Sequence, residues 1–129
     1  MISRFSEADM SYKGGDRAEF GIIDEFSRDK DYRDEYEPDK YHCIAICDDA
    51  LNAWWEHLTD MDTFFHTFKR PGKGLARWGI TLIPPSSIPQ LRRVVDIYTD
   101  AQYKTDASEI VALLDEAIEK NLYVIHYGI

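Results

Sequence analysis

The sequence contains no long apolar run, and it has few basic residues and only two cysteines. Nowhere do about 18 apolar residues follow one another, so no transmembrane helix is expected. The opening MISRFSEADM is interrupted by Glu7 and Asp9 and lacks the apolar core of a signal peptide. These two absences lead us to expect a cytoplasmic protein.

Basic residues are outnumbered, with 15 Lys and Arg against 24 Asp and Glu and a net charge of −9. Non-specific binding to nucleic acid or to an anionic membrane needs a dominant cationic surface, so both are excluded as expectations. The balance suits a protein that meets a partner more basic than itself.

The cysteines are too few and too far apart along a strand to form a disulfide framework. Cys43 and Cys47 lie in YHCIAICDD, which reads as a strand. Four residues along a strand span roughly 13 Å, whereas a disulfide needs Cα atoms within ~7 Å. We therefore expect reduced thiols, packed as small buried hydrophobic groups.

Motifs for catalysis or cofactor binding are also missing. Gly74 follows Lys73 where a phosphate-binding loop requires Ser or Thr, and no G-x-S-x-G nucleophile motif occurs. The cysteines and histidines form no repeated close pairs, so no metal site is expected. His126, on an apolar strand, is expected to be a core histidine. No catalytic residue and no cofactor is predicted, and the indications of an enzyme are weak.

What the sequence does contain is enough apolar material for one domain. The chain has 129 residues, of which 44% are hydrophobic and 13% aromatic. Residues 41–129 form the predicted α+β core: a mixed or antiparallel sheet with about three helices packed on one face. The expected order is β-α-β-β-α-α-β, with strands at 41–47, 63–68, 75–83 and 122–129 and helices at 48–58, 86–98 and 106–120. Asp48 or Asp49, Ser86 or Ser87, and Asp106 are the expected N-caps, and Asn121 is the expected helix end.

The first forty residues differ from the core because charge dominates them. Residues 23–40 alternate eight acids with four bases and show no helical or strand period. We expect residues 1–40 to be a charged arm of the same domain, with a short strand at 19–23 returning it to the sheet. An alternative is an acidic, tyrosine-bearing surface that contacts a partner. Its candidate residues are Tyr32, Asp34, Glu35, Tyr36 and Glu37.

A second candidate surface is the stretch TFFHTFKRPGKGLARWG, which places four bases within nine positions. We expect a hairpin with Pro71, Gly72 and Gly74 in its turn, and with the bases on the turn and the strand ends. This basic turn is either a solvated hairpin, a site for an anionic ligand, or a region covered by the acidic arm. Its candidate residues are His66, Lys69, Arg70, Lys73, Arg77 and Trp78.

Three hypotheses for function remain open from the sequence. The first is a small acidic interaction protein, of inhibitor or immunity type, that binds a basic protein. The second is a domain or minor enzyme that binds an anionic small molecule through the basic turn. The third is a subunit of a homodimer.

Overall fold

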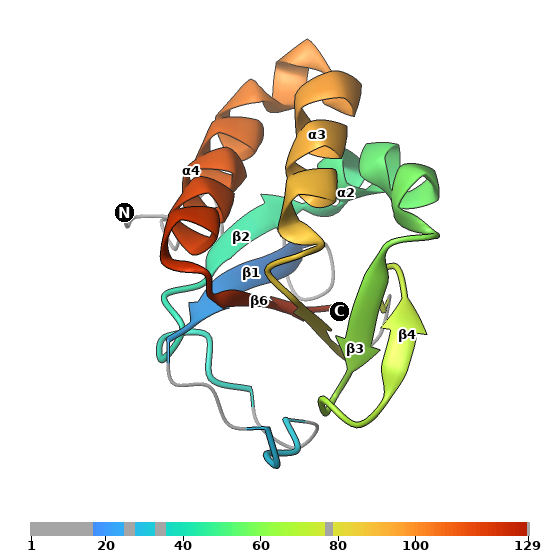
Figure 1. The fold of residues 1–129 in the computed structure, drawn as a ribbon. Coiled ribbons are helices and arrows are strands. Elements are labelled where there is room, and N and C mark those ends of the chain that lie inside the picture. The colour runs from blue at the N-terminus through green and yellow to red at the C-terminus, as the bar shows by residue number, and fades with distance from the viewer. Residues whose placement is uncertain (1–16, 25–27, 33–35, 77–78, 129) are drawn as a thin grey trace.

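The computed structural model describes residues 17–24, 28–32, 36–76 and 79–128. They form a six-stranded sheet in the order β2-β1-β6-β5-β3-β4, with every neighbouring pair antiparallel (Figure 1). The strands are β1 (Arg17–Ile23), β2 (Ile44–Cys47), β3 (Asp62–Phe65), β4 (Pro71–Lys73), β5 (Ile80–Ile83) and β6 (Tyr123–Tyr127).

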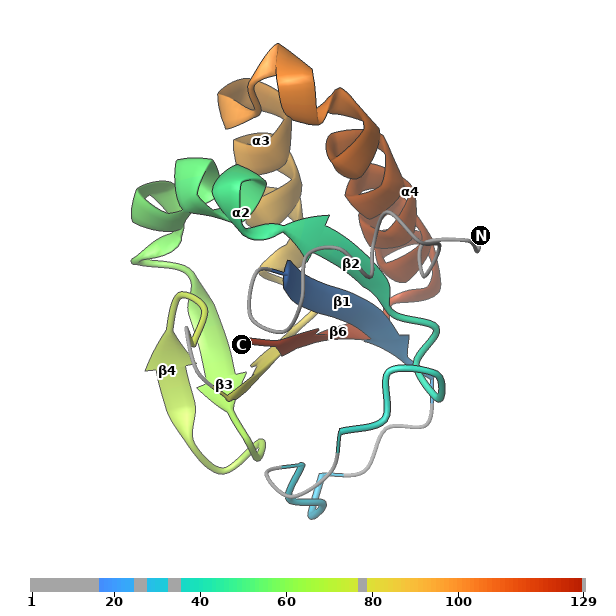
Figure 2. The same ribbon diagram turned by 180° about the vertical axis from the view of Figure 1, so that it is seen from behind.

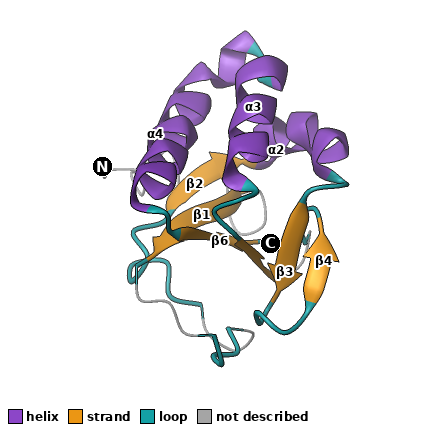
Figure 3. Ribbon diagram, in the orientation of Figure 1, coloured by secondary structure: helices purple, strands orange, loops and turns teal. Residues whose placement is uncertain are grey.

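The helices gather on one face of this sheet (Figure 3). They are α2 (Asp48–Trp55), α3 (Ile88–Tyr98) and α4 (Lys104–Lys120), and the short 3₁₀ turns η2 (Glu56–Leu58) and η3 (Ala101–Tyr103) follow α2 and precede α4. The prediction of an α+β fold with helices on one face is confirmed. Within the described residues, no helix has the length and apolar character needed to cross a membrane.

The hairpin forms between β3 and β4, whereas we predicted it between β3 and the strand at 75–83. Pro71 and Gly72, expected in a turn, belong to the edge strand β4, and the turn that joins it to β3 spans 66–70. Strand β5 then pairs with the other side of β3. Proline is tolerated here because β4 lies at the sheet edge, where one side of the strand needs no ladder partner.

Two predicted helix caps are wrong. Helix α2 begins at Asp48 with Cys47 as its N-cap residue, and α4 begins at Lys104, before Asp106. Asp106 instead accepts a hydrogen bond of 2.9 Å from the backbone N–H of Cys47, so it links the two helix starts. Ser87 is the N-cap residue of α3, but its hydroxyl donates to the Asp62 carbonyl, at 2.7 Å. The predicted left-handed end at Asn121 is confirmed by its φ of 56°.

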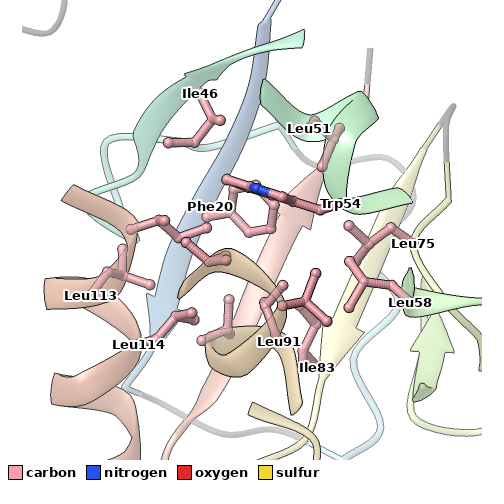
Figure 4. Close-up of a cluster of buried hydrophobic side chains, with 14 of the residues drawn as sticks. Phe20, Ile46, Leu51, Trp54, Leu58, Leu75, Ile83, Leu91, Leu113 and Leu114 are labelled. Carbon is pink, nitrogen blue, oxygen red and sulfur yellow. The ribbon is translucent and has the colours of Figure 1, made fainter. Parts of the chain in front are cut away.

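The main core lies between the sheet and the helices (Figure 4). Phe20 of β1, Trp54 of α2, Leu91 of α3 and Leu114 of α4 meet there and are all fully buried. Each such side chain contributes roughly 1.5–3 kcal/mol on burial, which is why the apolar stripes of the three helices turn inward. His126 is also fully buried, as predicted, and its Nδ1 lies 3.2 Å from the Glu19 carbonyl oxygen.

The opposite face of the sheet carries a second, aromatic core. It is covered by the irregular segment between β1 and β2, the covering segment, whose described residues are 28–32 and 36–43 (Figure 2). Tyr32, Tyr41 and Cys43 from this segment pack against side chains of the strands and of the 66–70 turn. The sheet-side members are Ile23, Phe68, Ile80, Leu82, Ile125 and Tyr127.

Gly21 shows how closely the covering segment approaches the sheet. A Cβ placed on Gly21 would lie 2.6 Å from the Cys43 sulfur and 2.7 Å from the Tyr41 carbonyl oxygen. Neither distance is compatible with a side chain, so glycine is required by close packing, although its backbone conformation is not left-handed. Neither cysteine forms a disulfide; Cys43 is buried and Cys47 is partly buried.

Gly21→Ala is therefore expected to lower the free energy of unfolding by about 1–3 kcal/mol through overpacking. Urea denaturation measures the change, and Ser86→Ala, at an exposed position, is the control expected to leave stability unchanged. An unaltered unfolding free energy in Gly21→Ala would mean that residues 41–43 do not pack on β1 as described.

Candidate functional site

Two bases of the basic turn, Lys69 and Lys73, are paired with carboxylates. Lys73 forms an ion pair with Asp62 across the β3–β4 pair, and Lys69 lies 3.4 Å from the Asp29 carboxylate. Asp62 raises the pKa of Lys73, first by accepting its hydrogen bond and second through the negative charge of the carboxylate. Both ion pairs are exposed and so contribute little to stability, but they reduce the positive charge that a ligand would meet.

His66 has a structural position beside this turn. Its backbone takes a φ of 68°, and its N–H donates to the Ile80 carbonyl, at 3.1 Å. The imidazole lies against Gly79, where an added Cβ would come within 2.9 Å of the ring. Arg70 is exposed at the start of the edge strand. Arg77 and Trp78, the other two predicted ligand-binding residues, lie outside the described residues.

The covering segment reaches across to the basic turn at two points. Asp29 is the partner of Lys69, and the Tyr32 backbone N–H donates to the His66 carbonyl oxygen, at 2.8 Å. These contacts match the alternative in which the acidic arm lies over the basic turn. The opposite charges of the two regions therefore meet, at least in part, within the molecule.

The candidate partner-binding residues of the arm are separated by the fold. Tyr32 is only 1% exposed, and its ring packs edge-on against Phe68 with 6.1 Å between centroids. Its expected role on an exposed contact surface is corrected: the ring is needed to cover the sheet. Asp34 and Glu35 lie outside the described residues.

Tyr36 and Glu37 remain accessible but are tied to the sheet. Tyr36 is 64% exposed, yet its hydroxyl donates to the buried Glu19 carboxylate and its ring packs edge-on against Tyr127. The Glu37 backbone N–H donates to the Tyr127 hydroxyl oxygen, at 3.3 Å. Together these contacts fasten the end of the covering segment to β1 and β6.

Sequence reasoning missed the surface with the largest charge surplus. Residues 48–60 and 88–120, which build the helical layer, contain eleven acids and four bases. Their net charge is −7 of the chain's −9, whereas residues 62–87 contain one acid and four bases. Summing the net charge over each predicted helix, instead of looking for the most charge-dense stretch, would have revealed this layer.

Two of the four bases of the helical layer, Arg92 and Lys120, are bound by carboxylates. Arg92 contacts Asp115 at 2.6 Å and Asp96 at 2.5 Å, and Lys120 lies 3.0 Å from Glu116. These carboxylates raise the pKa of both basic groups, so the bases stay protonated at neutral pH. Arg92 faces two carboxylates and Lys120 faces one, so these contacts leave the negative surplus of the layer in place.

The helical layer also exposes apolar side chains at the end of α3. Ile97 is 60% exposed and Tyr98 40%, and they are two of the four large hydrophobic residues exposed among the described residues. The Tyr98 ring stacks on the His57 ring of η2, with centroids 3.5 Å apart and planes within 7°. We call His57, Ile97 and Tyr98 the α3 patch. A neighbouring groove of about 470 Å³ separates the end of α3 from the start of α4 and has Val95, Ala107 and Val111 among its lining residues.

Comparison with protein families, curated proteins and solved structures gives no match. In the part of the chain that the structure describes, no three His, Cys, Asp or Glu side chains are arranged as metal ligands. What the described surface offers is a negative helical layer with an apolar patch, and a basic edge hairpin paired with the covering segment.

The attachment of Tyr36 predicts a dependence of stability on alkaline pH. Burial and then the hydrogen bond to Glu19 raise the pKa of Tyr36 above its ordinary value of about 10. A raised folded-state pKa adds stability that is complete below about pH 10 and is lost as the pH rises through the folded-state pKa. Tyr127, whose pKa burial also raises, acts in the same direction.

Tyr36→Phe is accordingly expected to reduce the loss of unfolding free energy between about pH 9 and about pH 11. Urea denaturation at each pH measures the slope, and tyrosinate absorbance should show one fewer late-titrating tyrosine. A variant with the slope and titration curve of the wild type would show that Tyr36 is not held by Glu19.

Proposed function

We propose that this protein is a small acidic interaction module that binds a more basic protein, as an inhibitor or immunity-type protein would. The proposal is carried by the net charge of −7 on the helical layer, which is confined to one side of the sheet. A single-sign surface attracts an oppositely charged partner over long range and speeds their encounter, an effect that weakens with salt.

The fold supports this use of the helical layer because the helices already bury their apolar stripes against the sheet, and their outer side is open to a partner. The charged side chains of the layer point outward from three helices. An interface built on packed helices changes little on binding, so less ordering entropy is lost when a partner docks.

The anionic-ligand alternative has less support from the described residues. Lys69 and Lys73 each face a carboxylate, and His66 is packed against Gly79. An anionic ligand would have to displace those carboxylates before it could use the bases. The alternative stays a prediction, as does the homodimer.

The proposal is tested with two triple variants that make the same change of charge, one in the helical layer and one in the arm. The helix variant combines Glu56→Lys, Asp100→Lys and Glu119→Lys; the arm variant combines Asp24→Lys, Asp31→Lys and Asp39→Lys. All six carboxylates are exposed, and the two variants have equal net charge. Each tagged protein is used to capture partners from host lysate across a salt series, with mass spectrometry as the readout.

We expect the wild type to retain a stoichiometric basic protein that is released as salt rises. The helix variant should weaken this complex by about tenfold or more, because it removes the attraction at the docking face, and the arm variant should keep it. Selective loss in the arm variant would move the interface to the arm. Equal retention by all three proteins, or a partner insensitive to salt, would overturn an electrostatic docking function.

A further inference from the structure

The α3 patch combines an exposed aliphatic side chain, a pre-positioned aromatic ring and a border of carboxylates. We propose that it is the anchoring point of the interface, and that it takes a basic segment of the partner that also carries an apolar side chain, as one face of an amphipathic helix does. This inference rests on the proposed function and names the residues that the attracted partner would contact.

The aromatic part of the α3 patch is ordered before any partner arrives. Because Tyr98 stacks in parallel on His57, its ring lies in one orientation between η2 and α3. A rigid ring loses little conformational entropy on binding, which is why tyrosine is frequent among the residues that dominate interface energies. Ile97, next to it in α3, adds an apolar surface that is mostly open to solvent.

The backbone that carries the patch is also fixed. The buried Trp54 of α2 donates its indole N–H to the Thr99 hydroxyl, at 2.8 Å. The Thr99 hydroxyl in turn donates to the Val95 carbonyl, at 2.6 Å, and so holds the last turn of α3. Ile97 and Tyr98 lie between these two bonded positions, so the patch stands on an interlocked pair of helices.

The charges around the patch determine the chemistry of its occupant. In the sequence, Glu56 and Asp60 lie on either side of His57, and Asp96 and Asp100 lie on either side of Ile97 and Tyr98. Asp60 accepts a hydrogen bond of 3.0 Å from the Gln90 side chain. Among the described residues no lysine or arginine forms an ion pair with Glu56 or Asp100, while Asp96 is shared with Arg92. Arg93 lies one helical turn before Ile97 and adds one positive charge. Glu56, Asp60 and Asp100 outnumber it, so the residues next to the patch keep a negative surplus.

The charge of the layer by itself predicts one kind of partner, and the charge combined with the α3 patch predicts another. A purely basic segment would satisfy the carboxylates of the whole helical layer and would have no preferred position. A basic segment with an apolar side chain can bury Ile97 and the free face of Tyr98, which fixes its position. Ile118 of α4, 39% exposed, provides a matched comparison within the same layer.

The test uses two synthetic peptides of equal length and charge, an amphipathic Lys/Leu peptide and a Lys/Ser peptide that lacks apolar side chains. Each is titrated into the 129-residue protein, with amide chemical shifts giving the position and fluorescence giving the affinity. Wild type, Ile97→Ser and Ile118→Ser are compared, and both substitutions are at exposed positions that the fold tolerates.

We expect the Lys/Leu peptide to shift amides around residues 96–99 and 57, and to bind more tightly than the Lys/Ser peptide. Ile97→Ser should weaken it by about tenfold, and Ile118→Ser by less than about twofold, because only Ile97 is covered. Equal effects of the two substitutions, or shifts centred elsewhere, would overturn the inference.

The peptides also separate this inference from the proposed function. If both peptides bind equally, in a salt-sensitive way and without regard to Ile97, the acidic docking function stands and the α3 patch is not its anchor. If neither peptide binds and no salt-sensitive partner is captured, both proposals fail.

Discussion

The structure depends on burying the sheet on both faces. β1 and β6 are interior strands, and their side chains alternate between the core under the helices and the aromatic core under the covering segment. Helices can cover one face because each supplies an apolar stripe. The other face is covered by an irregular, charge-rich segment that contributes only a few apolar side chains, chiefly Tyr32, Tyr41 and Cys43. Close approach then becomes essential, and it is why a glycine stands at position 21.

This burial also arranges the charge of the molecule. Carboxylates cannot enter either core unpaired, so those of the helical segments collect on the outer side of the helical layer. On the opposite side, the covering segment brings Asp29 to Lys69, and its Tyr36 hydroxyl meets the buried Glu19. In the helical layer, Asp96, Asp115 and Glu116 pair with the layer's own bases and Asp106 bonds to Cys47, whereas Glu56 and Asp100 form no ion pair among the described residues and are accessible to a partner.

A basic partner would then be attracted by one side of the molecule and positioned by the α3 patch. Attraction and positioning are separate physical tasks, because long-range charge accelerates encounter and buried apolar contact slows dissociation. His57 and Tyr98 come from elements that are remote in the sequence, and their stacking depends on α3 packing beside η2. The α3 patch is therefore a product of the fold.

The sequence by itself determined the α+β class, the helices, a strand at 19–23, a strand at 41–47 of which 44–47 is formed, and the final strand, because the period of the apolar residues and the turn residues are local properties. It also determined that His126 is a core residue, since an apolar strand marks what must be buried. Only the tertiary structure decided that β4 begins at Pro71, that Asp106 bonds to Cys47 instead of capping its own helix, and that Tyr32 is buried. Each of these depends on a partner distant in the chain, and no local pattern records which partner the fold will bring.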